Sequence, residues 1–202
     1  HSRKALAKLE HLVVQDIFMT ETAWNADIIL PASAHAEKTG TYTNTNRQVQ
    51  IGRAVVEPPK EVRQDWWIIQ EIAKRMGLGW DYKSPKDIFD EMKLIMPSLD
   101  NISWERLEKD NHVTYPVKSE LIPGEDIIFT NGFPTSNNLA KIIPVNLINP
   151  NDELNSDFPL ILSTGRLLEH WHTGTMTRRA LVLNELEPDP MIFMNKVDSN
   201  FY

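Results

Sequence analysis

The stretch Leu12–Ala34 most constrains the fold, because it alternates apolar and polar segments at the lengths of a strand–helix–strand unit. Leu12–Val14 is apolar and predicts a buried strand, and a second apolar strand at Ile28–Leu30 ends at Pro31. Between the two strands, Thr20 can cap a short helix. The pattern therefore predicts a compact βαβ unit and an α/β fold class built on a parallel sheet.

Polar side chains follow the first of these predicted strands. Gln15 and Asp16 stand where a parallel strand releases the chain, and Thr20 comes shortly after them. In βαβ units, ligands collect at the carboxyl ends of the strands. A carboxylate there can accept paired hydrogen bonds from a guanine edge or a ribose diol. The alternative is that Asp16 only caps the helix that follows, and the spacing leaves both interpretations open.

Composition bounds the class of protein. With 202 residues, 41% of them hydrophobic, the chain can bury a core and is not expected to be disordered. A net charge of -7 without a long basic run argues against nucleic acid as the main partner. The absence of cysteine excludes disulfides, Cys-ligated zinc, iron–sulfur clusters and a cysteine nucleophile within these residues. No apolar run approaches the roughly 20 residues of a membrane span.

Three helices are predicted in the middle of the chain. The first covers 65–76, with Asp65 as its cap and Gly77 as its stop. Its apolar stripe is Trp66, Ile69, Ala73 and Met76, with Ile68 and Ile72 beside it. The second begins at the sequence Ser84-Pro85-Lys86-Asp87, and its buried face is expected to be Ile88, Met92 and Ile95. A third, short helix is expected to begin at Ser103.

A second polar cluster lies at 43–47, between two short predicted strands. The alternation of Val49, Ile51 and Val55 predicts an exposed hairpin or sheet edge. The hydroxyls, amides and single guanidinium from Thr43 to Arg47 suit contacts with phosphate or sugar. An ordinary polar hairpin would have the same composition, so this alternative stays open.

The segment 113–157 is rich in Pro, Gly and Asn and is interpreted as a connection between two structural units. Within it, strands are expected only at 127–130 and 140–145. A buried strand is then predicted at 159–164. The chain begins inside a helical pattern and ends in what reads as a strand and turn cut short, so we expect a fragment of a longer protein.

A third polar cluster follows the strand predicted at 159–164. It consists of Arg166, His170, His172, Thr173, Thr175, Arg178 and Arg179. The cluster is cationic within an acidic chain and suits an anion such as a pyrophosphate. The spacing of His170 and His172 also allows a metal pair, but no carboxylate or cysteine stands where it would complete the shell. Structural packing is the third interpretation.

Two long segments resemble the molybdopterin oxidoreductases. VVQDIFMTETAWNADIILPASAHAEKTGTYTNTNRQVQ carries the first resemblance, and TGRLLEHWHTGTMTRR resembles the start of the family's C-terminal dinucleotide-binding domain. Together with RQDWWIIQEIAKRMG and DIIFTNGFP, they make the chain most similar to the catalytic α subunit of molybdenum- or tungsten-dependent formate dehydrogenases. The resemblance implies a Rossmann-like parallel-sheet domain portion at 1–112, a connection at 113–157, and the start of a double-psi β-barrel at 158–202.

The resemblance also implies a cofactor and its contacts. Such enzymes bind two molybdopterin guanine dinucleotides around one molybdenum or tungsten. By position, Asp16 and Thr20 would contact the guanosine end of one dinucleotide. Asn46 stands where relatives often have an acid near the cofactor. The pterin–pyrophosphate portion would be held by Arg166, His170, His172 and Thr173. We therefore expect Asp16 and the 166–173 loop to converge on opposite ends of one pterin nucleotide.

The implied activity is oxidation of formate to CO2, with two electrons passing through the metal and iron–sulfur clusters to a partner carrier. The family's metal-ligating cysteine or selenocysteine and its cluster motif would lie upstream of His1, so this span alone is expected to be inactive. The implied partners are the rest of the α subunit and iron–sulfur or NAD-linked electron-transfer subunits, in the cytoplasm, with a periplasmic location also open. The alternatives are the large iron–sulfur subunit of a NADH dehydrogenase and a non-catalytic scaffold that has lost the cofactor.

Overall fold

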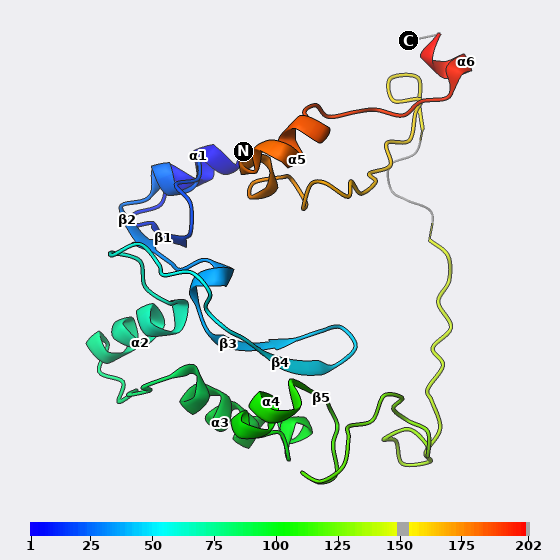
Figure 1. Cartoon of the computed structure of the whole chain (residues 1–202). Coiled ribbons are helices and arrows are strands. Elements are labelled where there is room, and N and C mark those ends of the chain that lie inside the picture. The colour runs from blue at the N-terminus through cyan, green and yellow to red at the C-terminus, as the bar shows by residue number, and fades with distance from the viewer. Residues whose placement is uncertain (149–153, 201–202) are drawn as a thin grey trace. The chain divides into compact units, whose positions relative to one another are not determined.

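The computed structural model describes residues 1–148 and 154–200 (Figure 1). The chain divides into two units, His1–Lys141 and Ile142–Tyr202, which are described separately below. Their boundary falls within the segment 113–157, which the sequence predicts to be a connection. Residues 149–153 of that connection and the last two residues of the predicted barrel segment lie outside the described residues. The expected pair of domains stays a prediction.

The first unit begins with the short helix α1 (Ser2–Leu6) and a parallel pair of strands. Strand β1 (Val13–Asp16) pairs with β2 (Ile28–Pro31), and the last residues of the two strands, Asp16 and Pro31, lie opposite each other. The pair confirms the two predicted parallel strands, but the expectation that the first strand is buried is wrong, because Val13 is 45% exposed.

The helix predicted between these strands does not form, and this expectation is wrong. The connection contains only the 3-10 turn η1 (Ala23–Asn25). The link from Asp16 to Ile28 is short for a crossover that carries an α-helix. In addition, the backbone N–H groups of Ile17 and Phe18 donate to the Asp16 carboxylate, so the chain leaves the strand in a turn.

A second, antiparallel sheet follows, in the order β3-β4-β5. Its strands are β3 (Gly40–Thr43), β4 (Gln48–Gly52) and β5 (His112–Thr114). The predicted hairpin is confirmed as β3 and β4, but the expectation of an exposed edge is wrong for β4. The unpredicted strand β5 pairs with its other side, with Val49 opposite Val113. Val49 is only 1% exposed as a result.

The three predicted helices are present, together with two short 3-10 turns. They are α2 (Asp65–Arg75), α3 (Pro85–Ile95) and α4 (Trp104–Asp110), and the turns are η2 (His35–Glu37) and η3 (Pro97–Leu99). The cap of α2 is Gln64, one residue before the predicted Asp65. At α3 the Asp87 carboxylate accepts from Ser84 N at 3.0 Å, and at α4 the Ser103 hydroxyl accepts from Arg106 N at 3.1 Å. The start signals of α3 and α4 were therefore correctly identified.

The buried faces of α2 and α3 match the predicted ones only in part. In α2, Ile68 and Ala73 are buried, whereas Met76 is 77% exposed. In α3, Phe89 is 2% exposed and the predicted core residue Ile95 is 77% exposed. Each helix carries apolar residues on more than one stripe, so the sequence period alone could not decide which stripe meets the core.

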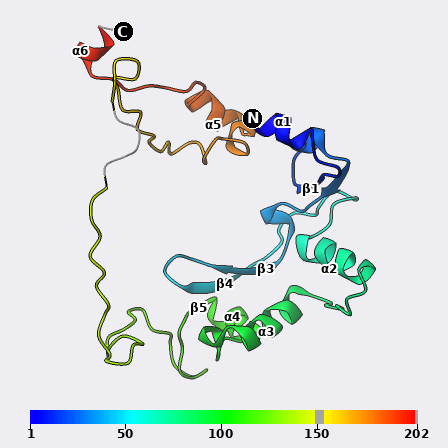
Figure 2. The same ribbon diagram turned by 180° about the vertical axis from the view of Figure 1, so that it is seen from behind.

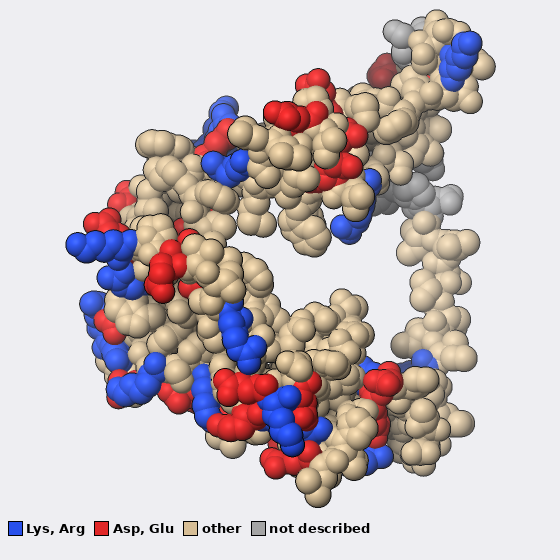
Figure 3. All heavy atoms as spheres, in the orientation of Figure 1, with Lys and Arg blue, Asp and Glu red and all other residues tan. Residues whose placement is uncertain are grey.

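The main core of the first unit lies between α3, α4 and the antiparallel sheet (Figure 2). Its fully buried members are Val49, Phe89, Leu99, Ile102, Trp104, Leu107, Val113 and Val117. Phe89 and Trp104 meet edge-to-face, with ring centroids 6.3 Å apart. Lys86 also joins the two helices, because it pairs with Asp90 at 2.8 Å and Glu105 at 3.1 Å. Figure 3 shows basic and acidic side chains interleaved on the face in view.

The second unit contains the 3-10 turn η4 (Thr177–Arg179) and the short helices α5 (Leu181–Leu186) and α6 (Lys196–Ser199). The strand predicted at 159–164 is absent. Its apolar residues Ile161 and Leu162 are 80% and 83% exposed. The strands predicted at 127–130 and 140–145 are also absent. A strand needs a partner for its backbone groups, and none of these segments pairs with another within the described residues.

None of the helices in the described ranges 1–148 and 154–200 combines the length and the apolar character that crossing a bilayer requires.

Replacing Phe89 by Ala should destabilise the first unit by about 3–5 kcal/mol, because the change leaves a cavity in the core. The matched control is Ile95→Ala in the same helix, which should cost less than about 0.5 kcal/mol because Ile95 is exposed. Urea unfolding followed by circular dichroism measures both. Equal losses would contradict the observed orientation of α3.

Candidate functional site

Asp16 ends β1 at the carboxyl edge of the parallel sheet. Its Oδ1 accepts from Ile17 N at 2.7 Å and from Phe18 N at 3.2 Å, so the carboxylate caps the turn that follows the strand. Its Oδ2 accepts no hydrogen bond from any residue that the structure describes. The two interpretations of Asp16 are thus compatible, because one oxygen shapes the turn and the other is available to a ligand.

Thr20 lies in the same turn, and its side chain bonds to the first residue of η1. The Thr20 hydroxyl oxygen accepts from Ala23 N at 3.3 Å, as a cap of η1 does. Ala23 is fully buried, and η1 lies against β1. The hydroxyl hydrogen of Thr20 is not used by this contact, so it can still be donated to a ligand.

Ser33 is a polar residue at this edge that the sequence patterns did not single out. It follows β2, and its Oγ is buried without a hydrogen-bond partner among the described residues. Ala32 N donates to Asp16 O at 3.1 Å, so the backbone segments that carry Asp16 and Ser33 are hydrogen-bonded here. A buried hydroxyl without a partner is uncommon, and Ser33 stands just after β2 at the same end of the parallel sheet as Asp16.

The side chain of Gln15 has a structural role, because it bonds to Asp65 at the start of α2. Its side-chain amide donates to Asp65 Oδ1 at 2.7 Å, and Lys38 Nζ donates to Asp65 Oδ2 at 2.5 Å. Burial raises the pKa of Asp65, but the hydrogen bonds from Lys38 and Gln15 outweigh this effect and hold the pKa below its ordinary value of 3.8. The carboxylate therefore joins β1, the start of α2 and the segment before β3.

Because the pKa of Asp65 is lowered on folding, its contribution to stability is present above pH 3.8 and is lost as the pH falls through the folded-state pKa. Asp65→Asn should therefore cost stability near neutral pH, by less than about 1 kcal/mol because the side chain is partly exposed. At about pH 3 the difference from the unmodified chain should shrink. Urea unfolding at both pH values measures this; Asp100→Asn, at an exposed residue, is the control. A pH-independent difference would contradict the ion pair.

The cluster Thr43–Arg47 forms the turn of the β3–β4 hairpin. Asn46 is exposed, and its Oδ1 lies 3.5 Å from Gln48 N. The guanidinium of Arg47 points back into the unit, where it donates to three carbonyl oxygens: Tyr115 O, Glu125 O at 3.0 Å and Asp126 O at 2.7 Å. Arg47 therefore holds the 115–126 loop against the hairpin. Of the two interpretations left open for this cluster, the geometry of Arg47 favours the structural one.

Arg47→Lys should loosen the 115–126 loop, because an ammonium cannot reproduce the fork that reaches three carbonyls. We expect hydrogen exchange of backbone amides in 115–126 to accelerate about tenfold, as loss of one or two charge-assisted bonds implies. Arg53→Lys is the control, because Arg53 is exposed and its side chain forms no hydrogen bond or ion pair with the described residues. Unchanged exchange in Arg47→Lys would contradict this role.

In the second unit, His170 is buried and organises the loop around it. Its Nε2 lies 2.7 Å from Glu187 O, which can only accept, so Nε2 carries a hydrogen. Its Nδ1 lies 3.1 Å from the Thr177 hydroxyl, which also accepts from Trp171 N at 3.2 Å. Both ring nitrogens of His170 are thus engaged inside the segment 170–188. Its expected contact with a cofactor stays a prediction.

Arg178 is also engaged within this segment. Its guanidinium donates to Asn184 Oδ1 at 3.1 Å and to Pro188 O at 2.8 Å. The Arg178 side chain passes close to Gly174, where a β-carbon would lie 2.8 Å from Arg178 Cγ. Gly174 also has a positive φ of 76°, so glycine is required here for two reasons.

Other members of the cluster face solvent. Arg166 is exposed and forms no hydrogen bond or ion pair with the residues described. His172 has a positive φ of 51° and meets Trp171 edge-on, with ring centroids 4.8 Å apart. The hydroxyls of Thr173 and Thr175 lie 3.3 Å apart. Arg179 is exposed as well, and its Nε donates to Thr175 O at 3.1 Å. Cations and hydroxyls are therefore presented outward, which is the composition of an anion-binding surface.

The described residues contain no group of three or more His, Cys, Asp or Glu side chains placed to hold a metal ion. His170 and His172 therefore lack a third ligand within the part of the chain that the structure describes. The predicted contacts also fall in different units, Asp16, Thr20 and Asn46 in the first and the 166–173 loop in the second. Their expected convergence on one ligand stays a prediction.

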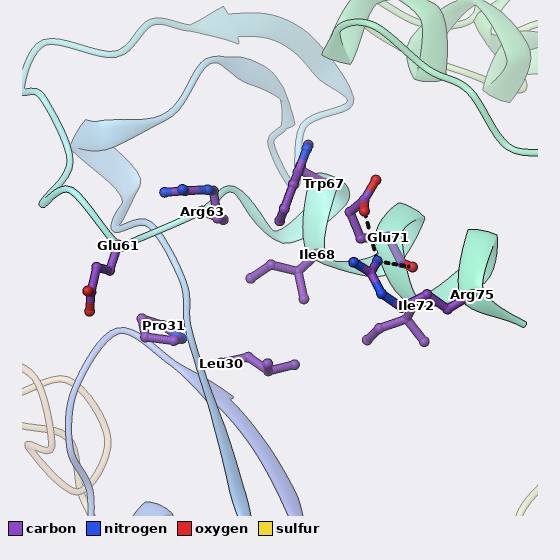
Figure 4. A pocket seen from close by; sticks show the side chains of 9 residues that line it. All are labelled: Leu30, Pro31, Glu61, Arg63, Trp67, Ile68, Glu71, Ile72 and Arg75. Carbon is purple, nitrogen blue, oxygen red and sulfur yellow. Dashed lines mark hydrogen bonds and ion pairs between the residues drawn. The ribbon is translucent and has the colours of Figure 1, made fainter.

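A cavity of about 360 Å³ lies elsewhere in the first unit, between the end of β2 and α2 (Figure 4). Leu30 from β2 and Ile68 and Ile72 from α2 line it, and the Arg63 guanidinium lies 5.7 Å from the centre of the Trp67 ring. The Glu71–Arg75 ion pair, at 2.8 Å, forms part of its rim. None of the predicted site residues lines this cavity.

The comparisons with known proteins show what the chain is similar to. Residues 1–75, which include Asp16 and Thr20, match the molybdopterin oxidoreductase family. Over 201 residues the chain is 43% identical to the F420-dependent formate dehydrogenase subunit alpha of Methanocaldococcus jannaschii, covering 98% of this chain and 30% of that protein. The family match thus covers the part of the chain that contains both parallel strands. The resemblance inferred from the sequence motifs is thereby confirmed.

Other proteins are similar over most of the chain. The F420-dependent formate dehydrogenase 2 subunit alpha of Methanococcus maripaludis is 42% identical over 93% of this chain and 28% of its own length. A probable oxidoreductase of Bacillus subtilis is 39% identical over 94% of this chain and 19% of its own length. The chain thus spans less than a third of the length of these relatives. Acetylene hydratase from Pelobacter acetylenicus is a structural match with a TM-score of 0.46 and 28% identity, over 57% of this chain and 16% of that one.

Proposed function

We propose that this chain forms part of the cofactor cradle in the alpha subunit of a formate-oxidising molybdopterin oxidoreductase. The observation that carries the proposal is the 43% identity to a formate dehydrogenase alpha subunit over 98% of the chain. The Asp16 turn also lies within residues 1–75, the part of the chain that matches the molybdopterin oxidoreductase family. Formate as substrate, CO2 as product and iron–sulfur or NAD-linked partner subunits in the cytoplasm are parts of this proposal.

The residues at the carboxyl edge of the parallel sheet suit the nucleotide end of such a cofactor. Asp16 Oδ2 can accept hydrogen bonds from the N–H groups of a guanine edge, and the Thr20 hydroxyl can donate to the same nucleoside. Ser33 Oγ, buried and partnerless, adds a polar atom beside them. The guanine dinucleotide form of the cofactor is therefore the form that we propose.

The second unit suits the phosphate portion. Arg166 supplies a cation that the described residues do not neutralise, and Thr173 and His172 supply exposed donors near it in sequence. His170 would position this loop through its bonds to Thr177 and Glu187. Asn46, exposed at the hairpin turn, would lie near the cofactor as well. The Rossmann-like domain and the double-psi barrel are the folds that we propose for the complete protein around these residues.

The metal chemistry would come from outside this chain's own side chains. When bound, a molybdenum or tungsten centre on the pterin would supply the acceptor for the two electrons of formate. The sequence has no cysteine, and the described residues hold no three-ligand metal group, so this span would bind and orient the organic part of the cofactor. Of the alternatives, none of the relatives named above is described as a NADH dehydrogenase subunit or as a scaffold.

Binding of GDP to the purified chain tests the proposal, because GDP carries the guanosine and diphosphate of the proposed cofactor. We expect isothermal titration calorimetry to show tighter binding of GDP than of ADP, since only guanine presents the paired N–H donors that a carboxylate accepts. Asp16→Asn should weaken GDP binding about tenfold to a hundredfold. Asp100→Asn is the control and should bind as the unmodified chain does. Equal affinity of the Asp16→Asn variant for GDP would contradict the assignment.

A further inference from the structure

One tryptophan of the first unit lies open to solvent beside the Asp16 turn. Trp24 is 73% exposed, whereas Trp67 and Trp80 in the same unit are 38% and 40% exposed. The sequence patterns assigned no role to Trp24, although its position four residues after Thr20 could have drawn attention to it. The indole therefore offers an open aromatic face on which another planar ring can stack.

The local hydrogen bonds determine where the indole lies. Trp24 N donates to Thr20 O at 3.0 Å, which is the helical spacing of i to i+4. Side chains at this spacing lie on the same side of a turn, so Trp24 and Thr20 share one side of this turn. Ala23, the residue before it, is fully buried and anchors η1 against β1. Trp24 is therefore held outward on a turn that cannot rotate freely.

This position complements the contacts already proposed for a nucleotide. A carboxylate such as Asp16 meets the edge of a guanine ring in the plane of the ring. The two faces of the ring remain, and a base is held by its face when it stacks on an aromatic side chain. An exposed indole beside Thr20 supplies such a surface. Edge recognition selects guanine, whereas stacking stabilises any purine.

We propose that Trp24 stacks on the base of the nucleotide whose edge Asp16 recognises. This inference rests on the proposed function, and it assigns the two side chains different tasks. Asp16 determines which purine is bound, and Trp24 contributes affinity that does not depend on the identity of the purine. Both act at the carboxyl end of β1.

Calorimetric titration with GDP and ADP tests this division in four variants. Trp24→Ala should weaken the binding of both nucleotides by a similar factor, about tenfold, because stacking is tolerant of the base. Trp24→Phe keeps an aromatic face and should stay within about threefold of the unmodified chain. Asp16→Asn should lose the preference for GDP over ADP. Trp80→Ala, which removes an exposed indole elsewhere in the unit, should leave both affinities unchanged.

Fluorescence gives a second measurement that does not depend on the stability of the Ala variant. GDP should quench part of the tryptophan emission of the unmodified chain, and this part should be missing in Trp24→Phe. Full GDP affinity of Trp24→Ala, or quenching in Trp24→Phe identical to that in the unmodified chain, would overturn the stacking role of Trp24. If Asp16→Asn lost the preference for GDP in the same experiments, the proposed function would still stand. Failure of the unmodified chain to bind GDP would overturn both the proposed function and this inference.

Discussion

The carboxylate of Asp65 is the interaction on which the arrangement of the first unit depends. It accepts from Gln15 at the end of β1 and from Lys38 before β3, and it begins α2. One side chain thus joins the parallel strands, the hairpin sheet and a helix. The end of β1 that carries Asp16 is thereby tied to the rest of the unit. A binding edge needs such support, because a ligand gains affinity only from groups that are already in place.

Polar side chains in this chain divide into those that build loops and those that remain available. Arg47 and Arg178 each donate to backbone carbonyls, and His170 uses both of its ring nitrogens within its own segment. These contacts satisfy carbonyl groups that irregular loops would otherwise leave unpaired. Arg166 and Asp16 Oδ2 have no such partner among the described residues. The available groups are therefore fewer than the polar clusters in the sequence, and they are the better candidates for contact with a ligand.

The helix starts show what short sequence signals can predict. Ser84-Pro85-Lys86-Asp87 and Ser103 identified the starts of α3 and α4, because capping depends on groups within a few residues of each other. The Leu12–Pro31 pattern likewise predicted both parallel strands. The same local rules placed a helix between these strands, where the connection holds only a 3-10 turn. At the proposed site, the motifs singled out Asp16 and Thr20 but not Ser33 or Trp24, because burial and exposure come only from the structure.

The sequence by itself determined the resemblance to the molybdopterin oxidoreductases, the parallel strand pair, the hairpin and the helices, because these follow from motifs and from contacts between near neighbours. The tertiary structure alone decided that Phe89 and not Ile95 is buried, that β5 covers β4, and that Arg47 serves a loop. Each of these outcomes joins residues that are far apart in the chain. Several apolar stripes and several polar clusters were locally equivalent, and only their long-range partners distinguish them.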